Sequence, residues 1–193
     1  MKVVITGNPG VGKHTCGGLV AAALIANVVD LNKLALEVPS KQTEKGLDVD
    51  VRKLSLLVSR KLRKKMSSIV IGHLAPYVVY PGLVNTVVVL RKSPYELLKT
   101  LQERGYSTEK IKENVESEIL GVTLNDSIKT FGRRKVAEFD VTGKTSGQIA
   151  DQILSVIERK SKKEIGAVDW LALVSARGDM KRFFDYEMPA RRG

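Results

Sequence analysis

The sequence contains little cysteine, few aromatic residues and no long apolar run. Cys16 is the single cysteine among 193 residues, so no disulfide can form within the chain. This is typical of a reducing compartment, and we expect a cytoplasmic protein. The longest apolar stretch, residues 19–29, is too short to span a bilayer, so we expect no membrane association. Aromatic residues make up 5% of the chain, and they form no pattern of an RNA-stacking module.

Positive charge, in contrast, is in excess, because 32 Lys and Arg residues face 21 Asp and Glu residues and give a net charge of +11. Such a protein attracts polyanions, including nucleotides and RNA, although solubility alone explains the charge equally well. Residues 51–65 carry seven cations and no acid. A charge run is more often a solvated helix face, but the absence of acids favours contact with a polyanion such as ribosomal RNA. The cations are Arg52, Lys53, Arg60, Lys61, Arg63, Lys64 and Lys65.

Short apolar runs alternate with amphipathic segments along the chain. The runs lack polar alternation, which predicts strands buried on both faces, at residues 2–6, 68–71, 86–90 and 136–141. Helices are expected at residues 13–27, 31–37, 51–65, 94–104, 111–128, 145–159 and 168–184. The remainder of residues 28–50 is expected to be irregular, and residues 189–193 to be disordered. This order predicts an α/β fold with a parallel sheet flanked by helices.

The strongest motif lies directly after the first expected strand. Residues 7–13 read Gly-Asn-Pro-Gly-Val-Gly-Lys and match the phosphate-binding pattern G-x-x-x-x-G-K, with a helix expected to start there. Glycines such as Gly10 and Gly12 let backbone N–H groups turn toward phosphate oxygens. Lys13 brings a positive charge to the β- and γ-phosphates, and the helix start adds unpaired N–H groups. The sequence therefore predicts a P-loop that binds ATP.

One residue of this motif is unusual. His14 follows the lysine, where the pattern has Ser or Thr with a hydroxyl that binds Mg²⁺. Imidazole is a poor Mg²⁺ ligand, and the next residue, Thr15, is better placed for a phosphate contact. We therefore expect no protein metal ligand and Mg²⁺ held mainly by ATP and water. The His14 side chain either reaches bound phosphate or is simply exposed at the helix start.

A series of downstream residues narrows the class of protein. It consists of Gly72-His73, Arg91, Arg104-Gly105-Tyr106, Asn114, residues 116–119 and Gly143-Lys144. Together with the glycine loop, this series resembles the adenylate kinase isoenzyme 6 family, and its archaeal members most closely. The resemblance covers about residues 1–160 and implies a P-loop nucleoside monophosphate kinase domain. Within it, residues 30–53 resemble the monophosphate-binding segment and residues 103–113 the lid, and residues 161–193 form a C-terminal helical extension.

The resemblance also implies an activity and roles for individual residues. It implies transfer of phosphate from ATP with Mg²⁺ to AMP, a weak ATPase activity and a role in small ribosomal subunit maturation. A platform ribosomal protein, with ribosomal RNA, is the implied partner. Arg104 is expected to bind ATP phosphates from the lid, Lys144 to lie at the adenine end, and His73 to position a water or a phosphate. Ile71 departs from the family pattern, because an acid usually stands there.

Simpler explanations remain for two of these residues. Arg104 also suits the negative end of a helix, and His73 also suits a helix cap or a satisfied position beside the core. Three functional hypotheses follow. The chain is a kinase for AMP or a related nucleoside monophosphate, an ATP-driven ribosome assembly factor whose kinase activity is incidental, or a nucleotide sensor without catalysis. The third is motivated by His14 and Ile71.

Overall fold

Five parallel strands form the centre of the computed structural model, which describes residues 1–43 and 46–184. The spatial order is β2–β5–β1–β6–β7, and every neighbouring pair is parallel. The strands are β1 (Lys2–Thr6), β2 (Asn27–Asp30), β5 (Ser68–Ile71), β6 (Thr86–Arg91) and β7 (Val136–Asp140). The predicted α/β fold with a parallel sheet is therefore confirmed. Residues 189–193, which we expected to be disordered, lie outside the described residues.

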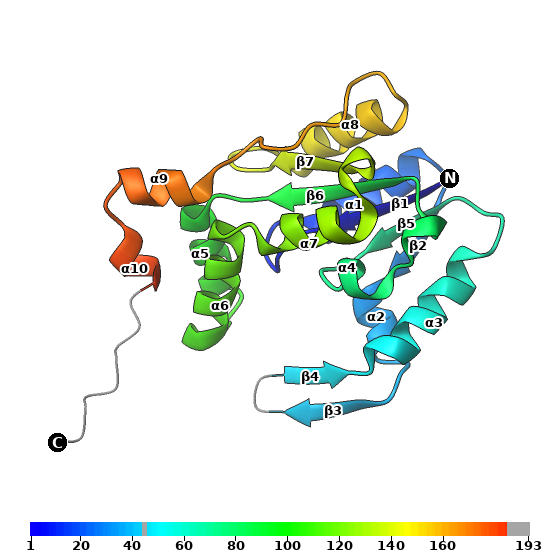
Figure 1. Cartoon of the computed structure of the whole chain (residues 1–193), viewed down its shortest axis with the longest axis horizontal. Helices are drawn as coiled ribbons and strands as arrows, with labels where there is room; N and C mark the ends of the chain where they lie inside the picture. Colours follow the sequence, from blue (N-terminus) through cyan, green and yellow to red (C-terminus); the bar gives the residue numbers. More distant parts are fainter. Residues whose placement is uncertain (44–45, 185–193) are drawn as a thin grey trace.

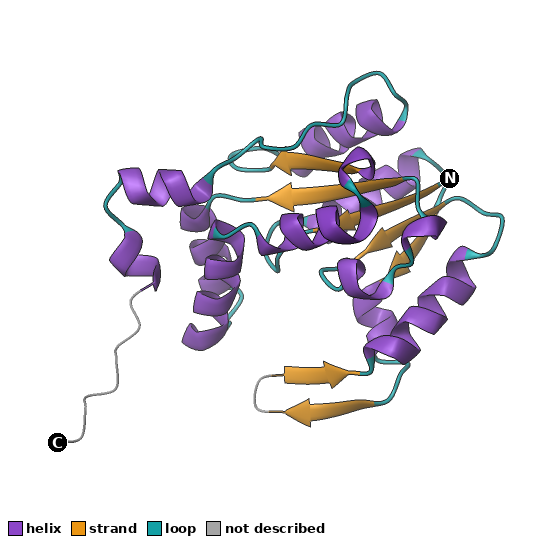
Figure 2. Cartoon of the chain, in the orientation of Figure 1, coloured by secondary structure: helices purple, strands orange, loops and turns teal. Residues whose placement is uncertain are grey.

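Helices cover both faces of the sheet, as Figure 2 shows. One face carries α1 (Lys13–Ala23) and α8 (Ser146–Ile157), which pack against each other. The other face carries α3 (Val51–Leu62), α4 (Ala75–Val78) and α7 (Val122–Phe131), with α2 (Leu31–Ala35) between β2 and α3. Helices α5 (Pro94–Glu103) and α6 (Thr108–Ile119) pair beside the carboxyl end of β6 (Figure 1). Short 3₁₀ turns at Pro81–Leu83 and Arg133–Lys135 precede β6 and β7.

The two faces of the sheet bury two separate apolar cores. Successive side chains of a strand point to opposite faces, so Val3 and Ile5 enter one core and Val4 the other. The α1 side includes the buried Cys16, whose thiol pKa is raised chiefly by burial, as suits a small packing residue. Because both faces are covered, the strands need no polar alternation, which explains their continuous apolar sequences.

The structure corrects several predicted boundaries in the first third of the chain. Strand β2 was missed because it is short and lies at a sheet edge, where Val28 is exposed. Helix α1 ends at Ala23, not at residue 27, because the chain turns through Ile25 with a φ of 48°. Residues 40–49, expected to be irregular, contain the antiparallel strands β3 (Ser40–Thr43) and β4 (Gly46–Val49). This hairpin projects from the body of the protein in Figure 1.

Glycines account for two further corrections. The helix expected at residues 111–128 is two helices, α6 and α7, because Gly121 adopts a φ of 65° between them. The helix expected at residues 168–184 likewise divides at Gly178 into α9 (Trp170–Ala176) and α10 (Met180–Phe184). Helix α3 stops at Leu62, and α4 was not predicted at all.

The C-terminal extension packs on the domain over residues 161–184. Its side chains Trp170, Val174 and Phe183 join the core on the α1 side of the sheet. The ring of Phe183 meets Tyr95 of α5 edge-on, with centroids 5.4 Å apart. In the part of the chain that the structure describes, no helix is both long and apolar enough to cross a membrane.

Candidate active site

The glycine loop joins the carboxyl end of β1 to the first turn of α1. Gly10 and Gly12 have φ values of 91° and 87°, which other residues rarely adopt. A Cβ atom on Gly10 would also lie 2.7 Å from Cδ1 of Leu97 in α5, so the buried Leu97 side chain would have to shift. The loop backbone therefore depends on glycine at these positions, as the P-loop motif requires.

Lys13 is buried against this loop, with 5% of its surface exposed. Its Nζ atom donates a hydrogen bond to the backbone carbonyl oxygen of Asn8, 3.2 Å away. Burial, together with the nearby charge of Arg104, lowers the pKa of Lys13 to about 8, while Asp30 acts in the opposite direction. A buried amine with this environment gains much from a polyanionic ligand, which would supply the missing negative charge.

Two other strands bring polar residues to the same edge of the sheet. Asp30 ends β2, and His73 lies two residues beyond β5, so both stand near the end of β1. Burial, then the charges of Lys13 and His14, lower the pKa of His73 to about 4. His73 is therefore neutral at pH 7. The Nε2 atom of His14 lies 3.4 Å from Oδ2 of Asp30.

Three further predicted site residues, Arg104, Thr15 and Lys144, are exposed. Arg104 is an exposed residue at the end of α5, and its charge acts on Lys13 at the loop. Thr15 is exposed on the first turn of α1, next to His14. Lys144 is also exposed, and its Nζ donates to the backbone carbonyl oxygen of Asp140 at 2.8 Å.

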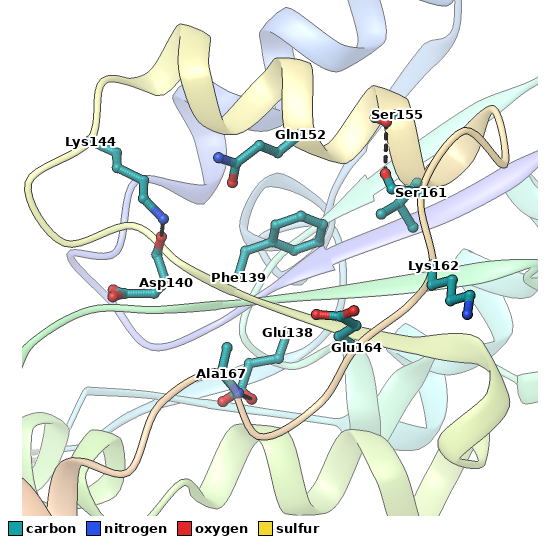
Figure 3. A pocket seen from close by; sticks show the side chains of 11 residues that line it. Glu138, Phe139, Asp140, Lys144, Gln152, Ser155, Ser161, Lys162, Glu164 and Ala167 are labelled. Atoms are coloured by element: carbon teal, nitrogen blue, oxygen red, sulfur yellow. Dashed lines mark hydrogen bonds between the residues drawn. The ribbon is translucent and has the colours of Figure 1, made fainter.

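Lys144 lines a cavity of about 490 Å³ between β7, α8 and residues 161–167. Figure 3 shows the Phe139 ring between the strand and the helix, with Lys144 at one end of the cavity and Lys162 at the other. No residue of the glycine loop lines this cavity.

A buried network of hydrogen bonds holds the glycine loop through the side chain of Asn8. The Asn8 side chain donates to Oε2 of Glu118 in α6 at 2.7 Å and accepts from the hydroxyls of Ser117 and Thr123. Arg91, at the end of β6, donates to Oε1 of Glu118 at 2.7 Å. The glycine motif and the resemblance included Asn8, Arg91 and Glu118 but gave them no role. The only sequence signal for this network is that Arg91 and Glu118, two residues of opposite charge, each stand next to apolar residues.

The same network extends to the C-terminal extension. Arg91 also binds Glu138 of β7 at 2.8 Å, and the second oxygen of Glu138 accepts the backbone N–H groups of Gly166 and Ala167. The indole N–H of Trp170 in α9 donates to Oε1 of Glu118 at 3.2 Å. The extension is thus joined to the glycine loop through two fully hydrogen-bonded buried carboxylates.

The residues at the loop do not fit side-chain binding of Mg²⁺ in the usual way. His14 presents an imidazole nitrogen in place of a hydroxyl oxygen, and Mg²⁺ prefers oxygen ligands. Ile71, where the resemblance leads us to expect an acid, has an apolar side chain that packs so closely on α1 that a Cβ on Gly17 would lie 2.5 Å from its Cδ1. Among the described residues, no group of three or more His, Cys, Asp or Glu side chains gathers around a possible ion.

A buried strand, a glycine loop with a buried lysine, and a parallel sheet define a P-loop protein, and comparison with solved structures gives the same class. A gluconokinase from Sinorhizobium meliloti 1021 matches with a TM-score of 0.57 and 18% identity, over 82% of this chain and 92% of that one. A shikimate kinase from Aquifex aeolicus matches with a TM-score of 0.53 and 18% identity, over 83% and 98%. At this identity, the likeness shows the fold alone.

Sequence relatives then define the family. A family model described as "AAA domain" matches residues 3–121. A protein of Thermococcus kodakarensis named "Putative adenylate kinase" is 36% identical over 171 residues, 88% of this chain and 93% of the relative. One of the same name from Saccharolobus islandicus is 34% identical over 175 residues, 89% of this chain and 88% of the relative. The chain belongs to the family of these archaeal adenylate kinase homologues, which confirms the resemblance.

Proposed function

We propose that this protein is a broad-specificity nucleoside monophosphate kinase that transfers the γ-phosphate of ATP to AMP and forms two ADP. The observation that carries the proposal is the buried Lys13 in a glycine loop, with His73 and Arg104 brought near it. Membership in a family whose members bear the adenylate kinase name supports the choice of acceptor. ATP would enter with Mg²⁺ held by its phosphates and by water.

The arrangement suits phosphoryl transfer because this reaction needs positioning and charge stabilisation more than covalent chemistry by the protein. Lys13 would exchange its contact with the Asn8 carbonyl for the β- and γ-phosphate oxygens. Arg104 would approach the same oxygens, stabilise the charge that develops during transfer and help exclude water. The neutral imidazole of His73 would orient the attacking group by a hydrogen bond.

Two segments would complete the site around the nucleotides. Residues 30–53, which start at Asp30, would bind the monophosphate, and residues 103–113, which include Arg104, would act as the lid over ATP. Lys144 would contact the adenine end from the side of the cavity in Figure 3. In the absence of an acceptor, water would take its place and give a weak ATPase activity.

The test is ADP production from ATP, with and without AMP, by the wild type and Lys13→Ala. We expect AMP to raise the rate and Lys13→Ala to lower it by about 100-fold or more, because a lost charge contact to a transferring group has this order of effect. Lys99→Ala, which changes an exposed lysine on α5, is the matched control and should keep the rate. An unchanged rate in folded Lys13→Ala would refute the proposal.

A second function is favoured by a separate observation. The cations of residues 51–65 are all exposed, on α3 and on the turn that follows it. This positive face supports a role as an ATP-dependent assembly factor, in which ATP turnover switches binding to a small-subunit ribosomal protein and its RNA. The two functions are compatible, because none of these cations belongs to the glycine loop.

A further inference from the structure

His14 and Asp30 form a close pair of side chains beside the glycine loop. His14 directly follows Lys13, and in P-loop proteins the residue at this position binds the metal ion that bridges the β- and γ-phosphates. Asp30 lies close enough to Lys13 to raise its pKa, so the carboxylate is also near the phosphate site. The two side chains come from α1 and from the end of β2, and they meet at a distance of 3.4 Å between Nε2 and Oδ2.

The Asp30 carboxylate is fixed in position by its own backbone. Its Oδ1 atom accepts hydrogen bonds from the N–H groups of Asn32 and Lys33, at 2.9 Å and 3.3 Å, and so caps helix α2. The other oxygen, Oδ2, is the one that faces His14. A carboxylate oriented in this way by outer hydrogen bonds is typical of metal-binding residues.

The spacing of the two atoms fits a shared ion. Two adjacent ligands of a six-coordinate ion, each about 2.1–2.2 Å from it, are about 3 Å apart. The distance of 3.4 Å is close to this value and longer than a typical N–H···O hydrogen bond of about 2.9–3.0 Å. A small movement of the partly exposed His14 ring would let both side chains bind one cation. Phosphate oxygens of ATP and water would complete the ligand set.

The chemistry of this pair points away from magnesium. Mg²⁺ prefers oxygen ligands and gives up water reluctantly, whereas first-row transition metal ions accept imidazole nitrogen. We propose that His14 and Asp30 directly bind a transition metal ion such as Mn²⁺ or Co²⁺ when it accompanies ATP, and that the site therefore favours such an ion over Mg²⁺, which ATP and water hold. The inference rests on the proposed function only in requiring that ATP binds at the glycine loop. Since the protein supplies two ligands, the ion binds tightly only together with the nucleotide.

The direct test is pulsed electron paramagnetic resonance of Mn²⁺ bound with a non-hydrolysable ATP analogue. The wild type is expected to show coupling of Mn²⁺ to a ¹⁴N nucleus of imidazole. His14→Ser should lose this coupling, and His73→Asn, which removes the other histidine of the chain, should keep it. The absence of coupling in the wild type, or its survival in His14→Ser, would overturn the proposal.

Calorimetric titration of the same analogue with Mg²⁺, Mn²⁺ or Co²⁺ supplies the affinity. The preference for Mn²⁺ over Mg²⁺ should be about tenfold greater in the wild type than in His14→Ser, and Co²⁺ should exceed Mn²⁺. Asp30→Asn, which keeps an oxygen to cap α2, should reduce the preference as well. Equal preferences in wild type and His14→Ser would overturn the metal assignment alone. A failure of the analogue to bind with any ion would overturn the proposed function too.

Discussion

Lys13 is the residue whose ionisation depends most on what occupies the site. Its pKa of about 8 reflects burial and the neighbouring Arg104, with Asp30 as the opposing acid and His14 and His73 close by. Bound triphosphate places several negative charges against the ammonium group, so the pKa of Lys13 must rise when ATP binds. A group whose pKa rises on binding takes up protons at pH values between the free and the bound pKa.

Binding of ATP should therefore take up a proton at alkaline pH. For a free pKa of about 8, Lys13 contributes about 0.1 proton at pH 7 and about 0.9 at pH 9. Calorimetry in buffers of different ionisation enthalpy, with EDTA to remove metal ions, measures the uptake. Lys13→Arg keeps a permanent positive charge and should lose most of the uptake at pH 9. Equal uptake in the two proteins would show that Lys13 is not the titrating group.

At the scale of elements, the notable feature is the junction between α6 and α9. Glu118 in α6 accepts from Asn8, Arg91 and Trp170, which come from the glycine loop, from β6 and from the extension. Removing one partner of a buried carboxylate is costly because the remaining atoms lose their compensation. The C-terminal extension therefore helps to hold the glycine loop in position, through the hydrogen bond from Trp170 to Glu118.

Trp170→Phe tests this junction, since it keeps an aromatic ring and removes the N–H donor to Glu118. We expect the free energy of unfolding to fall by about 2 kcal/mol, from a lost hydrogen bond to a charged group and some lost packing. Urea denaturation followed by circular dichroism measures the change.

Leu171→Ala, at an exposed position on the same helix, is the control and should change stability by less than about 0.5 kcal/mol. In a Glu118→Gln background, the effect of Trp170→Phe should shrink, because the two residues share one interaction. Effects of equal size at positions 170 and 171 would contradict the role assigned to the indole.

The sequence predicted the buried strands and the glycine loop because both depend on local patterns. Strands β1, β5, β6 and β7 are continuous apolar runs, and the loop is a seven-residue motif. It did not predict β2, because this strand lies at the exposed edge of the sheet and its apolar pattern is weaker. It also did not predict the helix breaks at Gly121 and Gly178, because each depends on the positive φ of a single residue. The network at Glu118 was also out of reach, because Asn8 and Glu118 are 110 residues apart.

The residues of the candidate site also differ in how far the sequence predicts them. Lys13 and His14 follow from the motif, and His73 and Arg104 were reached only through the family resemblance. Asp30 had no local signal, because a single acid at a loop start is common. Its place beside His14 depends on the parallel pairing of β2 with β5, which brings two strand ends to one edge of the sheet.

At the scale of the whole molecule, much of the excess positive charge lies on α3 and on the turn that follows it. Substitutions there can test whether these cations bind RNA. Replacing Arg60, Lys61 and Lys64 by Gln should weaken binding to small-subunit ribosomal RNA. The slope of a plot of log K against the logarithm of the salt concentration should also become less steep, by about two to three. Electrophoretic mobility shifts over a series of salt concentrations measure both.

The control makes an equal change of net charge elsewhere, with Arg133, Arg134 and Lys162, all exposed, replaced by Gln. This variant should bind RNA nearly as well as the wild type if the α3 face is the contact. An equal loss of affinity in both variants would show that only the overall charge matters. No loss in either variant would contradict the proposal that these cations bind ribosomal RNA.

The central claim is that the γ-phosphate of ATP passes to AMP at the Lys13 loop. The most direct measurement follows label from [γ-³²P]ATP, with unlabelled AMP present, in the wild type and Lys13→Ala. We expect label in the β-position of ADP, formed rapidly by the wild type and about 100-fold more slowly or not at all by the variant. Label found only in inorganic phosphate, at a rate that ignores AMP, would contradict the kinase and leave an ATPase.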